Sequence, residues 1–540
     1  MKHGSESFYI QGEGLVTTQV GGRTGEEGDP VSESETPRAK APRALAADAA
    51  PPFRFSRVGP RGAPLGAAVT KKLARAMVSE GGGVGAVPAG YTYLGQFIDH
   101  DLTMDRTTVM LGEDVRPIDM LQGRSPRLDL DSLYGNGPGD AASAKFYAAD
   151  GLHLKTGNTI ATPPDGAKAG HDLPRVGKGA TKKAKRVALV PDPRNDENLI
   201  VAQTHLAMIH FHNRVLDKLP ASVPAAQKFT RARKQVTLHY QWMIRHDYLP
   251  RICSRSVLDD VFTNGRKLVE PAAPPDSVPT MPVEFAVAAF RLGHSMVRPT
   301  YDWNKIFSGT GGLLEYMFQF SGLGGDLGGQ TRLITSWVAD FRRLYDFAAG
   351  GHPKLKPTSQ VNHARRIDTL LTDPLQNLPP SVFGGLGSIP FDDLRRNLAF
   401  RNLTRSAMVK LASGQQMVTK LQGLGAGGAP DPSRDHQGRR RRRRQPRTPH
   451  PYGEERINRS HAAVVLHPAR GGAEPWPATR GGGAHHRRDV PPVNGGQQVL
   501  TAPRPVVATG AGPQRHHVRD DRPHLFRLRR PEDRDKPARR

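Results

Sequence analysis

The sequence predicts a mainly α-helical protein with little β-structure. Over residues 53–423, apolar residues recur at helical spacing in several long segments, and strand-like alternation of apolar and polar residues is scarce. The chain has 540 residues and no apolar run long enough to span a bilayer, so we expect no membrane span. Its single cysteine, Cys253, excludes an internal disulfide and a cysteine zinc cluster.

Composition divides the chain into three regions. Residues 1–50 are rich in Gly, Glu, Ser, Pro and Ala without apolar periodicity, which predicts a disordered leader. The first residues lack a basic stretch followed by an apolar core, so we expect no secretory signal and a cytoplasmic or non-classically secreted protein. Residues 51–423 form the predicted helical domain, and residues 424–540 form a basic, low-complexity tail.

The first informative element is the segment YLGQFIDHDLTMD (93–105). It places Asp99, His100 and Asp101 together, shortly after the amide of Gln96, on a mostly apolar stretch. Taken alone, such a run is more often a helix end or a surface turn than a catalytic centre.

Two helices are predicted further along the chain. The first covers the segment after Arg194 and has an apolar face. Asp192 followed by Pro193 favours a helix start just before it. That face is made of Leu199, Ala202, Leu206, Ile209 and Val215. The second is predicted over residues 283–297, with Val283, Val287, Phe290, His294 and Val297 in one stripe. The Gly-, Lys- and Pro-rich residues 156–185 predict a long surface loop.

Four later segments join the first in a fixed order. They are RSPRLDLDSLYG (124–135), DPRNDENL (192–199) running into HFHNRV, FRLGHSMVRP (290–299) and NLAFRNLTRS (397–406). Together the five segments resemble the animal-type haem peroxidase family in its bacterial branch, over roughly residues 53–423. Five co-linear motifs are far more specific than any one of them.

The resemblance assigns three residues to one side of a haem b. His100 matches the distal histidine, and an imidazole near neutral pKa suits the proton transfer that cleaves a peroxide. Arg194 matches the fixed cation that stabilises the departing hydroxide. Gln96 matches the amide that holds water or a halide over the iron.

The resemblance places the iron's axial ligand at His294 and its hydrogen-bond partner at Asn402. By itself, a histidine in an apolar helical stripe is usually a core residue. Arg291 and Arg405 match the arginines that meet haem propionates, although ordinary salt-bridged arginines would look the same.

Two carboxylates match those that form ester bonds to haem methyl groups in mammalian relatives. They are Asp99 and Glu197, so the chain is competent for ester-linked haem. Glu197 is equally explained by first-turn helix electrostatics. Asn198 stands where one mammalian member has a methionine, so no third, sulfonium link is expected.

The resemblance also implies calcium, bound by an all-oxygen shell. Its ligands would be Asp101, Ser125, the carbonyl of Arg127, Asp129 and Asp131. Alternating Asp and Leu in this segment also describes a half-exposed strand. Because Asp101 follows His100, a calcium here would tie the distal histidine to the Ser125 loop.

The activity implied is reduction of hydrogen peroxide with oxidation of a halide, a pseudohalide or a small phenolic or organic donor. Fatty-acid dioxygenases on the same fold need a radical-forming tyrosine three positions before the proximal histidine, where this chain has Arg291. A peroxidase is therefore favoured over a dioxygenase. A catalytically dead or truncated product stays open, and after Asn402 the chain lacks the RGRDHG of mammalian members.

The tail explains most of the chain's positive charge. Residues 421–540 carry 25 Lys and Arg against 11 Asp and Glu, a net +14 of the chain's +26, and include six consecutive arginines at 439–444. This composition is typical of a nucleic-acid-binding arm. It also fits an out-of-frame reading of a GC-rich gene: a one-base shift turns residues 463–480 into LWFYILREAELNHGQRL, which resembles the family's C-terminal segments. We therefore favour a frame error and expect no nucleic-acid partner.

Overall fold

The computed structural model describes residues 7–10, 14–17, 53–79, 83–107, 111–274, 277–309, 311–357, 359–379 and 393–424. Most of the predicted leader (1–50) lies outside these residues. The predicted tail (424–540) does too, apart from its first residue. The leader, the tail and the frame error therefore stay predictions.

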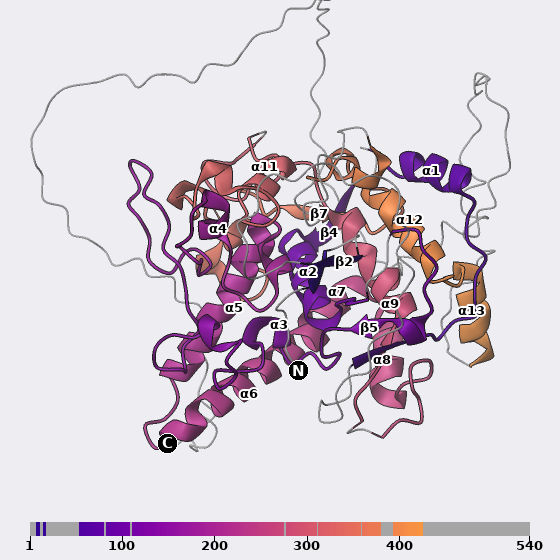
Figure 1. The fold of residues 1–540 in the computed structure, drawn as a ribbon, viewed down its shortest axis with the longest axis horizontal. Coiled ribbons are helices and arrows are strands. Elements are labelled where there is room, and N and C mark those ends of the chain that lie inside the picture. The colour runs from indigo at the N-terminus through magenta and orange to yellow at the C-terminus, as the bar shows by residue number, and fades with distance from the viewer. Residues whose placement is uncertain are drawn as a thin grey trace, which may run out of the picture. The chain divides into compact units, whose positions relative to one another are not determined.

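Helices dominate the described residues and confirm the mainly α class (Figure 1). The α-helices are α1 (Ala67–Ala76), α2 (Gly90–Leu102), α3 (Asp131–Tyr134), α4 (Lys182–Arg186), α5 (Leu199–Asp217), α6 (Ala225–Met243), α7 (Leu249–Ile252), α8 (Arg255–Asn264), α9 (Val283–Val287), α10 (Gly293–Met296), α11 (Leu314–Gln319), α12 (Leu398–Met408) and α13 (Gly414–Gly423). A π-helical turn, Ile244–Tyr248, joins α6 to α7. No helix in the described part of the chain is both long and apolar enough to cross a membrane.

Three small sheets make up the β-structure of the described residues. The strands are β1 (Ser7–Ile10), β2 (Gly14–Thr17), β3 (Phe53–Ser56), β4 (Val84–Pro88), β5 (Leu121–Gln122), β6 (Met281–Pro282) and β7 (His363–Arg365). β1 pairs with β2 and β4 with β7, both antiparallel, while β3 lies between antiparallel β5 and parallel β6.

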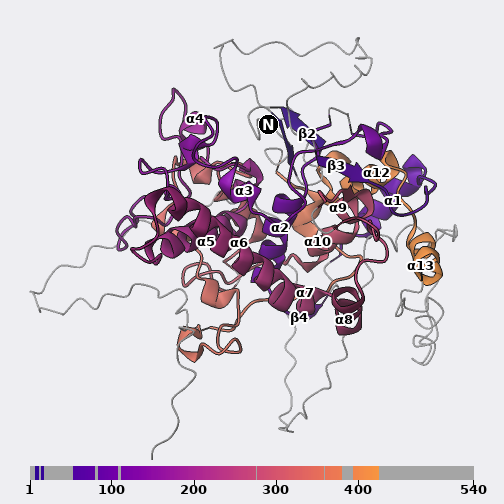
Figure 2. The ribbon, with the colours of Figure 1, turned by 90° about the horizontal axis from the view of Figure 1, so that it is seen from below.

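Helix α2 is the central element. It packs against α5 on one side and α10 on the other (Figure 2), and α6 packs against α5. Every residue of α2 is buried except Gly95 and Gln96, which are half-buried. The helix contributes Phe97 and Ile98 to one apolar cluster and Tyr93 to a second. A polar group on this helix is therefore held in the protein core.

The helix predicted after Arg194 is confirmed as α5, and its predicted apolar face is buried. It begins one residue after Asn198, whose side chain accepts from Val201 N. Asp192 instead caps a separate 3₁₀ turn, Pro193–Asp196. Arg194 therefore lies on a short turn ahead of α5, and its side chain is buried.

The prediction of one continuous helix over residues 283–297 is wrong. The segment is broken into α9, a 3₁₀ turn (Ala289–Leu292) and α10, because Ala288 leaves the helical region with φ −129° and ψ −67°. A single stripe of side chains cannot run through this break. His294 is nevertheless buried, on the short helix α10.

Two further segments, residues 124–135 and 156–185, differ in part from the strand and the surface loop that their sequences suggest. Residues 124–135 form no strand: Leu130 adopts a left-handed φ of 61°, and α3 follows it directly. Residues 156–185 are mostly loop, as predicted, but they end in the first residues of α4. Asp172 and Leu173 within them are buried, so this loop is partly built into the core.

Candidate active site

The Asp99–His100–Asp101 run lies inside the protein. These three side chains are 2%, 0% and 0% exposed. The helix that carries them ends at Thr103, which turns to extended backbone and donates its hydroxyl to the Asp99 carbonyl at 3.0 Å. A surface turn is therefore excluded as the explanation of this motif.

Within the described part of the chain, His100 makes a hydrogen bond through one ring nitrogen. Its Nδ1 lies 2.9 Å from Asn195 Oδ1, an arrangement in which Nδ1–H donates. Its Nε2 has no hydrogen-bond partner among the described residues and lies 3.5 Å from Glu197 Oε1. Gln96 donates to the same carboxylate and accepts from Asn198 at 3.0 Å. The two predicted distal side chains of α2, Gln96 and His100, thus meet at Glu197.

Arg194 is completely buried and held rigidly. Its Nη2 donates to the carbonyls of His100 (2.9 Å) and Thr103 (2.8 Å), and Asp192 accepts from both Nε and Nη2. Its Nη1 has no hydrogen-bond partner among the described residues. Burial alone would raise the pKa of Asp192, but the charges of Arg124 and Arg194 hold that pKa below its usual range. Arg194 is therefore a fixed cation next to His100.

His294 is bound to the residue that the sequence predicted. Its Nδ1 lies 2.8 Å from Asn402 Nδ2, which joins α10 to α12. Burial, with the nearby charge of Arg291, lowers the pKa of His294 to about 3. Its helix packs directly against α2. The structure thus places two buried histidines, His100 and His294, on neighbouring helices.

The predicted propionate arginines are buried and paired with aspartates. Arg291 Nη1 donates to Asp99 Oδ2 at 2.7 Å, and Arg405 Nη2 donates to Asp105 Oδ2 at 3.1 Å. The first pair links α2 to the turn before α10. Two residues expected to contact haem separately, Arg291 and Asp99, therefore contact each other.

The predicted calcium ligands are brought near one another without forming a closed shell. Burial and the charge of Asp129 raise the pKa of Asp101 to about 6. Burial also raises the pKa of Asp131, against the opposing charge of Arg124. Ser125 Oγ and one carboxylate oxygen of each of Asp129 and Asp131 lack hydrogen-bond partners in the described part of the chain. Within that same part, no group of three or more His, Cys, Asp or Glu side chains is arranged to hold a metal.

The site includes residues that the sequence did not single out. Asn195 and His205 are buried, and Asn195 bridges His100 to His205. Asn195 follows Arg194 directly, which is the one local signal for it. Nothing local marks His205, which lies eleven positions after Arg194 on a buried turn of α5.

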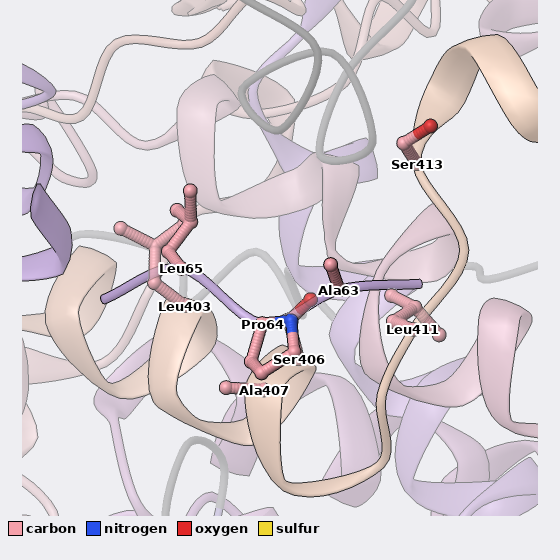
Figure 3. A pocket seen from close by; sticks show the side chains of 8 residues that line it. All are labelled: Ala63, Pro64, Leu65, Leu403, Ser406, Ala407, Leu411 and Ser413. Atoms are coloured by element: carbon pink, nitrogen blue, oxygen red, sulfur yellow. The ribbon is translucent and has the colours of Figure 1, made fainter. Parts of the chain in front are cut away.

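A surface pocket lies elsewhere. It is lined by residues 63–65 and by the end of α12 with the segment leading to α13 (Figure 3). None of the predicted site residues lines it. The pocket is therefore separate from the two histidines.

Comparisons with known proteins find similarity to haem peroxidases over part of the chain. Residues 102–320 match the family profile described as animal haem peroxidase. Thyroid peroxidase of Mus musculus is 29% identical over 195 residues, which are 34% of this chain and 20% of the mouse protein. Thyroid peroxidase of Rattus norvegicus is 28% identical, with the same coverage. The solved structure of peroxidase A from Dictyostelium discoideum aligns with a TM-score of 0.44 and 16% identity, over 69% of this chain and 75% of that chain.

The matched part is limited in extent. This chain spans about a fifth of the length of the thyroid peroxidases it matches. The family profile includes Arg194, Glu197 and His294, while His100 lies just before it and Asn402 after it. The five ordered motifs and the profile agree: residues 102–320 are similar to the animal haem peroxidase family.

Proposed function

We propose that this protein is a haem-dependent peroxidase that reduces hydrogen peroxide and oxidises a halide, a pseudohalide or a small phenolic or organic donor. The observation that carries the proposal is the pair of buried histidines on packed helices. His100 has an Nε2 atom without a hydrogen-bond partner among the described residues, and His294 is bound to Asn402. The match of residues 102–320 to the animal haem peroxidase profile supports the same class of reaction.

The residues of α2 and α10 fit a haem b. Only an unprotonated imidazole can bind iron, and burial keeps His294 neutral by lowering its pKa to about 3. We assign His294 as the iron ligand and Asn402 as the group that orients its ring. A half-turn of the Asn402 amide would let Nδ1–H donate to the amide oxygen, which leaves Nε2 for the iron.

The remaining haem contacts follow from the buried charges. We assign Arg291 and Arg405 to the propionates, because a guanidinium has enough donors to hold a second anion beside its aspartate. We assign Asp99 and Glu197 as the carboxylates for ester links, because both are buried, Glu197 beside His100 and Asp99 against Arg291.

When bound, the haem supplies the iron and the two electrons that cleave the peroxide bond. The chain's own residues supply the rest. His100 Nε2, which has no hydrogen-bond partner among the described residues, takes a proton from one peroxide oxygen and delivers it to the other. Arg194 stabilises the departing hydroxide with a charge that is already fixed before the reaction. Gln96 holds a water or a halide beside Glu197.

We further propose one calcium ion per chain. Asp101, Ser125, the Arg127 carbonyl, Asp129 and Asp131 would bind it, as inferred from the sequence. Two findings support a cation: the pKa of Asp101 is raised to about 6, and three buried oxygens lack hydrogen-bond partners among the described residues. A divalent ion would relieve the repulsion between these carboxylates.

Haem titration tests the proposal. Purified protein should take up one haem with a Soret band and then consume hydrogen peroxide with a donor such as iodide or guaiacol. His294→Ala should abolish ordered haem binding. His212→Ala, which removes another buried histidine of α5, should leave the Soret band in place. An unchanged Soret band in His294→Ala would refute the axial ligand, and a haem-loaded wild type that does not consume peroxide would refute the peroxidase.

A further inference from the structure

The side chain of His100 is the first of three buried side chains that are joined by hydrogen bonds. His100 Nδ1 lies 2.9 Å from Asn195 Oδ1, and Asn195 Nδ2 lies 2.9 Å from His205 Nδ1. The three residues are 0%, 0% and 1% exposed. His205 also packs edge-on against Phe97, with ring centroids 5.8 Å apart. Water therefore has no direct access from which to replace either hydrogen bond.

The donor and acceptor in each of these two hydrogen bonds decide which nitrogen of His100 carries the proton. An amide oxygen only accepts, so Asn195 Oδ1 requires a hydrogen on His100 Nδ1 and leaves Nε2 with a lone pair. An amide nitrogen only donates, so Asn195 Nδ2 requires an unprotonated Nδ1 on His205. A half-turn of the amide would reverse both bonds and move the His100 proton to Nε2.

We propose that Asn195 and His205 are positioning residues that fix His100 in the tautomer able to take a proton at Nε2. The inference rests on the proposed peroxidase function, because it explains how that function's base is prepared. His205 holds the Asn195 amide in one orientation, and Asn195 in turn holds the imidazole of His100. Neither residue touches peroxide.

The state of His205 agrees with this role. Burial lowers the pKa of His205 to about 3, and the nearby His100 lowers it further, while Asp192 opposes the shift. A neutral His205 with its proton on Nε2 accepts from the amide nitrogen at Nδ1. A proton on Nδ1 would present a donor there and turn the amide around.

The variants separate positioning from packing. Asn195→Leu removes the acceptor, and His205→Leu removes the group that orients the amide. Asn195→Asp keeps an acceptor for His100 Nδ1–H. Because a carboxylate has no N–H group, this variant cannot present a donor to His100. The matched control is Thr204→Val, which removes a buried hydroxyl of α5 that, among the described residues, bonds to the Ile200 carbonyl.

The first readout needs neither peroxide nor haem. Solid-state ¹⁵N spectra of full-length, histidine-labelled protein, with His100→Gln used for assignment, report which nitrogen of His100 is protonated. We expect Nδ1–H in the wild type and in Asn195→Asp, and a rise of the Nε2–H form in His205→Leu. A wild type with Nε2–H, or an unchanged tautomer in His205→Leu, would overturn the proposal.

The second readout uses the haem-loaded protein. Hydrogen cyanide must lose its proton to bind ferric haem, so the rate of the Soret shift on adding cyanide reports the base without catalysis. Asn195→Leu should slow cyanide binding and the reaction with peroxide by about 10- to 100-fold, and His205→Leu by about tenfold. Asn195→Asp should stay near wild type, and His205→Leu should have no further effect in that background.

The outcomes distinguish the two proposals. Wild-type rates in a haem-loaded Asn195→Leu protein would refute the positioning role. Equal losses of rate and of thermal stability in Asn195→Leu, Asn195→Asp and Thr204→Val would also refute it, because they would indicate packing alone. A wild type that shows the Nδ1–H tautomer but does not react with peroxide would refute the peroxidase and leave the positioning role standing.

Discussion

At the scale of single residues, the proposed chemistry depends on His100 and Arg194, whose side chains are held in place by hydrogen bonds to buried neighbours. His100→Gln and Arg194→Leu should keep the Soret band, because neither side chain is the proposed iron ligand. Each should slow the reaction with hydrogen peroxide by about 10²- to 10⁴-fold, since each removes a group needed as the peroxide bond breaks. Stopped-flow spectra at several peroxide concentrations measure this. Wild-type rates in either variant would contradict the assigned role.

A second residue-scale prediction concerns acid stability. His212 is buried, accepts from the Tyr134 hydroxyl and donates to the Leu152 carbonyl. Burial lowers its pKa from 6.5 to about 4. The unfolded chain therefore binds a proton in this pH range that the folded protein does not, so stability is highest above pH 6.5 and falls as the pH drops toward 4. The loss should reach about 3 kcal/mol at pH 4.

Denaturant unfolding between pH 4 and 7 tests this contribution. His212→Gln should lessen the slope of unfolding free energy against pH by close to one proton. The control, His239→Gln, changes an exposed histidine of α6 and should keep the wild-type slope. An identical slope in His212→Gln would show that acid sensitivity arises elsewhere.

At the scale of elements, the position of α2 depends on close approach to its neighbours. A Cβ added at Gly95 would lie 2.3 Å from the hydroxyl of Tyr248, a buried residue of the π-helical turn. Gly95→Ala should therefore destabilise the protein by about 1 to 3 kcal/mol in thermal or denaturant unfolding. Tyr248→Phe removes the clashing oxygen and should recover part of the loss in the double variant. Additive losses would mean that this contact does not limit the packing of α2.

The loop before α3 gives a second element-scale prediction. If calcium ties this loop to α2, dialysed protein should contain about one calcium per chain. Asp129→Asn should remove the metal and lower the melting temperature, and a chelator should do the same to the wild type. Asp119→Asn, which changes an exposed aspartate paired with Arg116, should leave the calcium content unchanged. A metal-free, fully active wild type would contradict the site.

At the scale of the whole molecule, the predicted tail should contribute nothing to the haem site. Its composition cannot offset the entropy of ordering it, and every residue assigned to chemistry lies before residue 424. Limited proteolysis should remove residues after about 424 first and leave a fragment that retains haem. Protein expressed from a frame-corrected gene should unfold at a higher temperature. A protease-resistant tail in the chain as given would overturn the frame-error hypothesis.

The sequence by itself determined the mainly helical class, the helix α5 and the identity of the paired residues His294 and Asn402. Periodicity reveals a long helix because one apolar face repeats every few residues, and ordered motifs identify a family. Neither signal predicts where a helix breaks. The break at Ala288 is a backbone deviation within an apolar run, so the predicted 283–297 helix was wrong.

Only the tertiary structure decided which groups meet. Asn195 and His205 are separated by ten positions. Asn195 contacts both His100 and His205 because the turn before α5 packs against α2. The pairing of Arg291 with Asp99, 192 positions apart, likewise depends on the packing of the turn before α10 against α2. Hydrogen bonds and charge pairs act over a few ångströms, whereas sequence patterns report local periodicity. The partners of a buried polar group therefore become visible only in the folded chain.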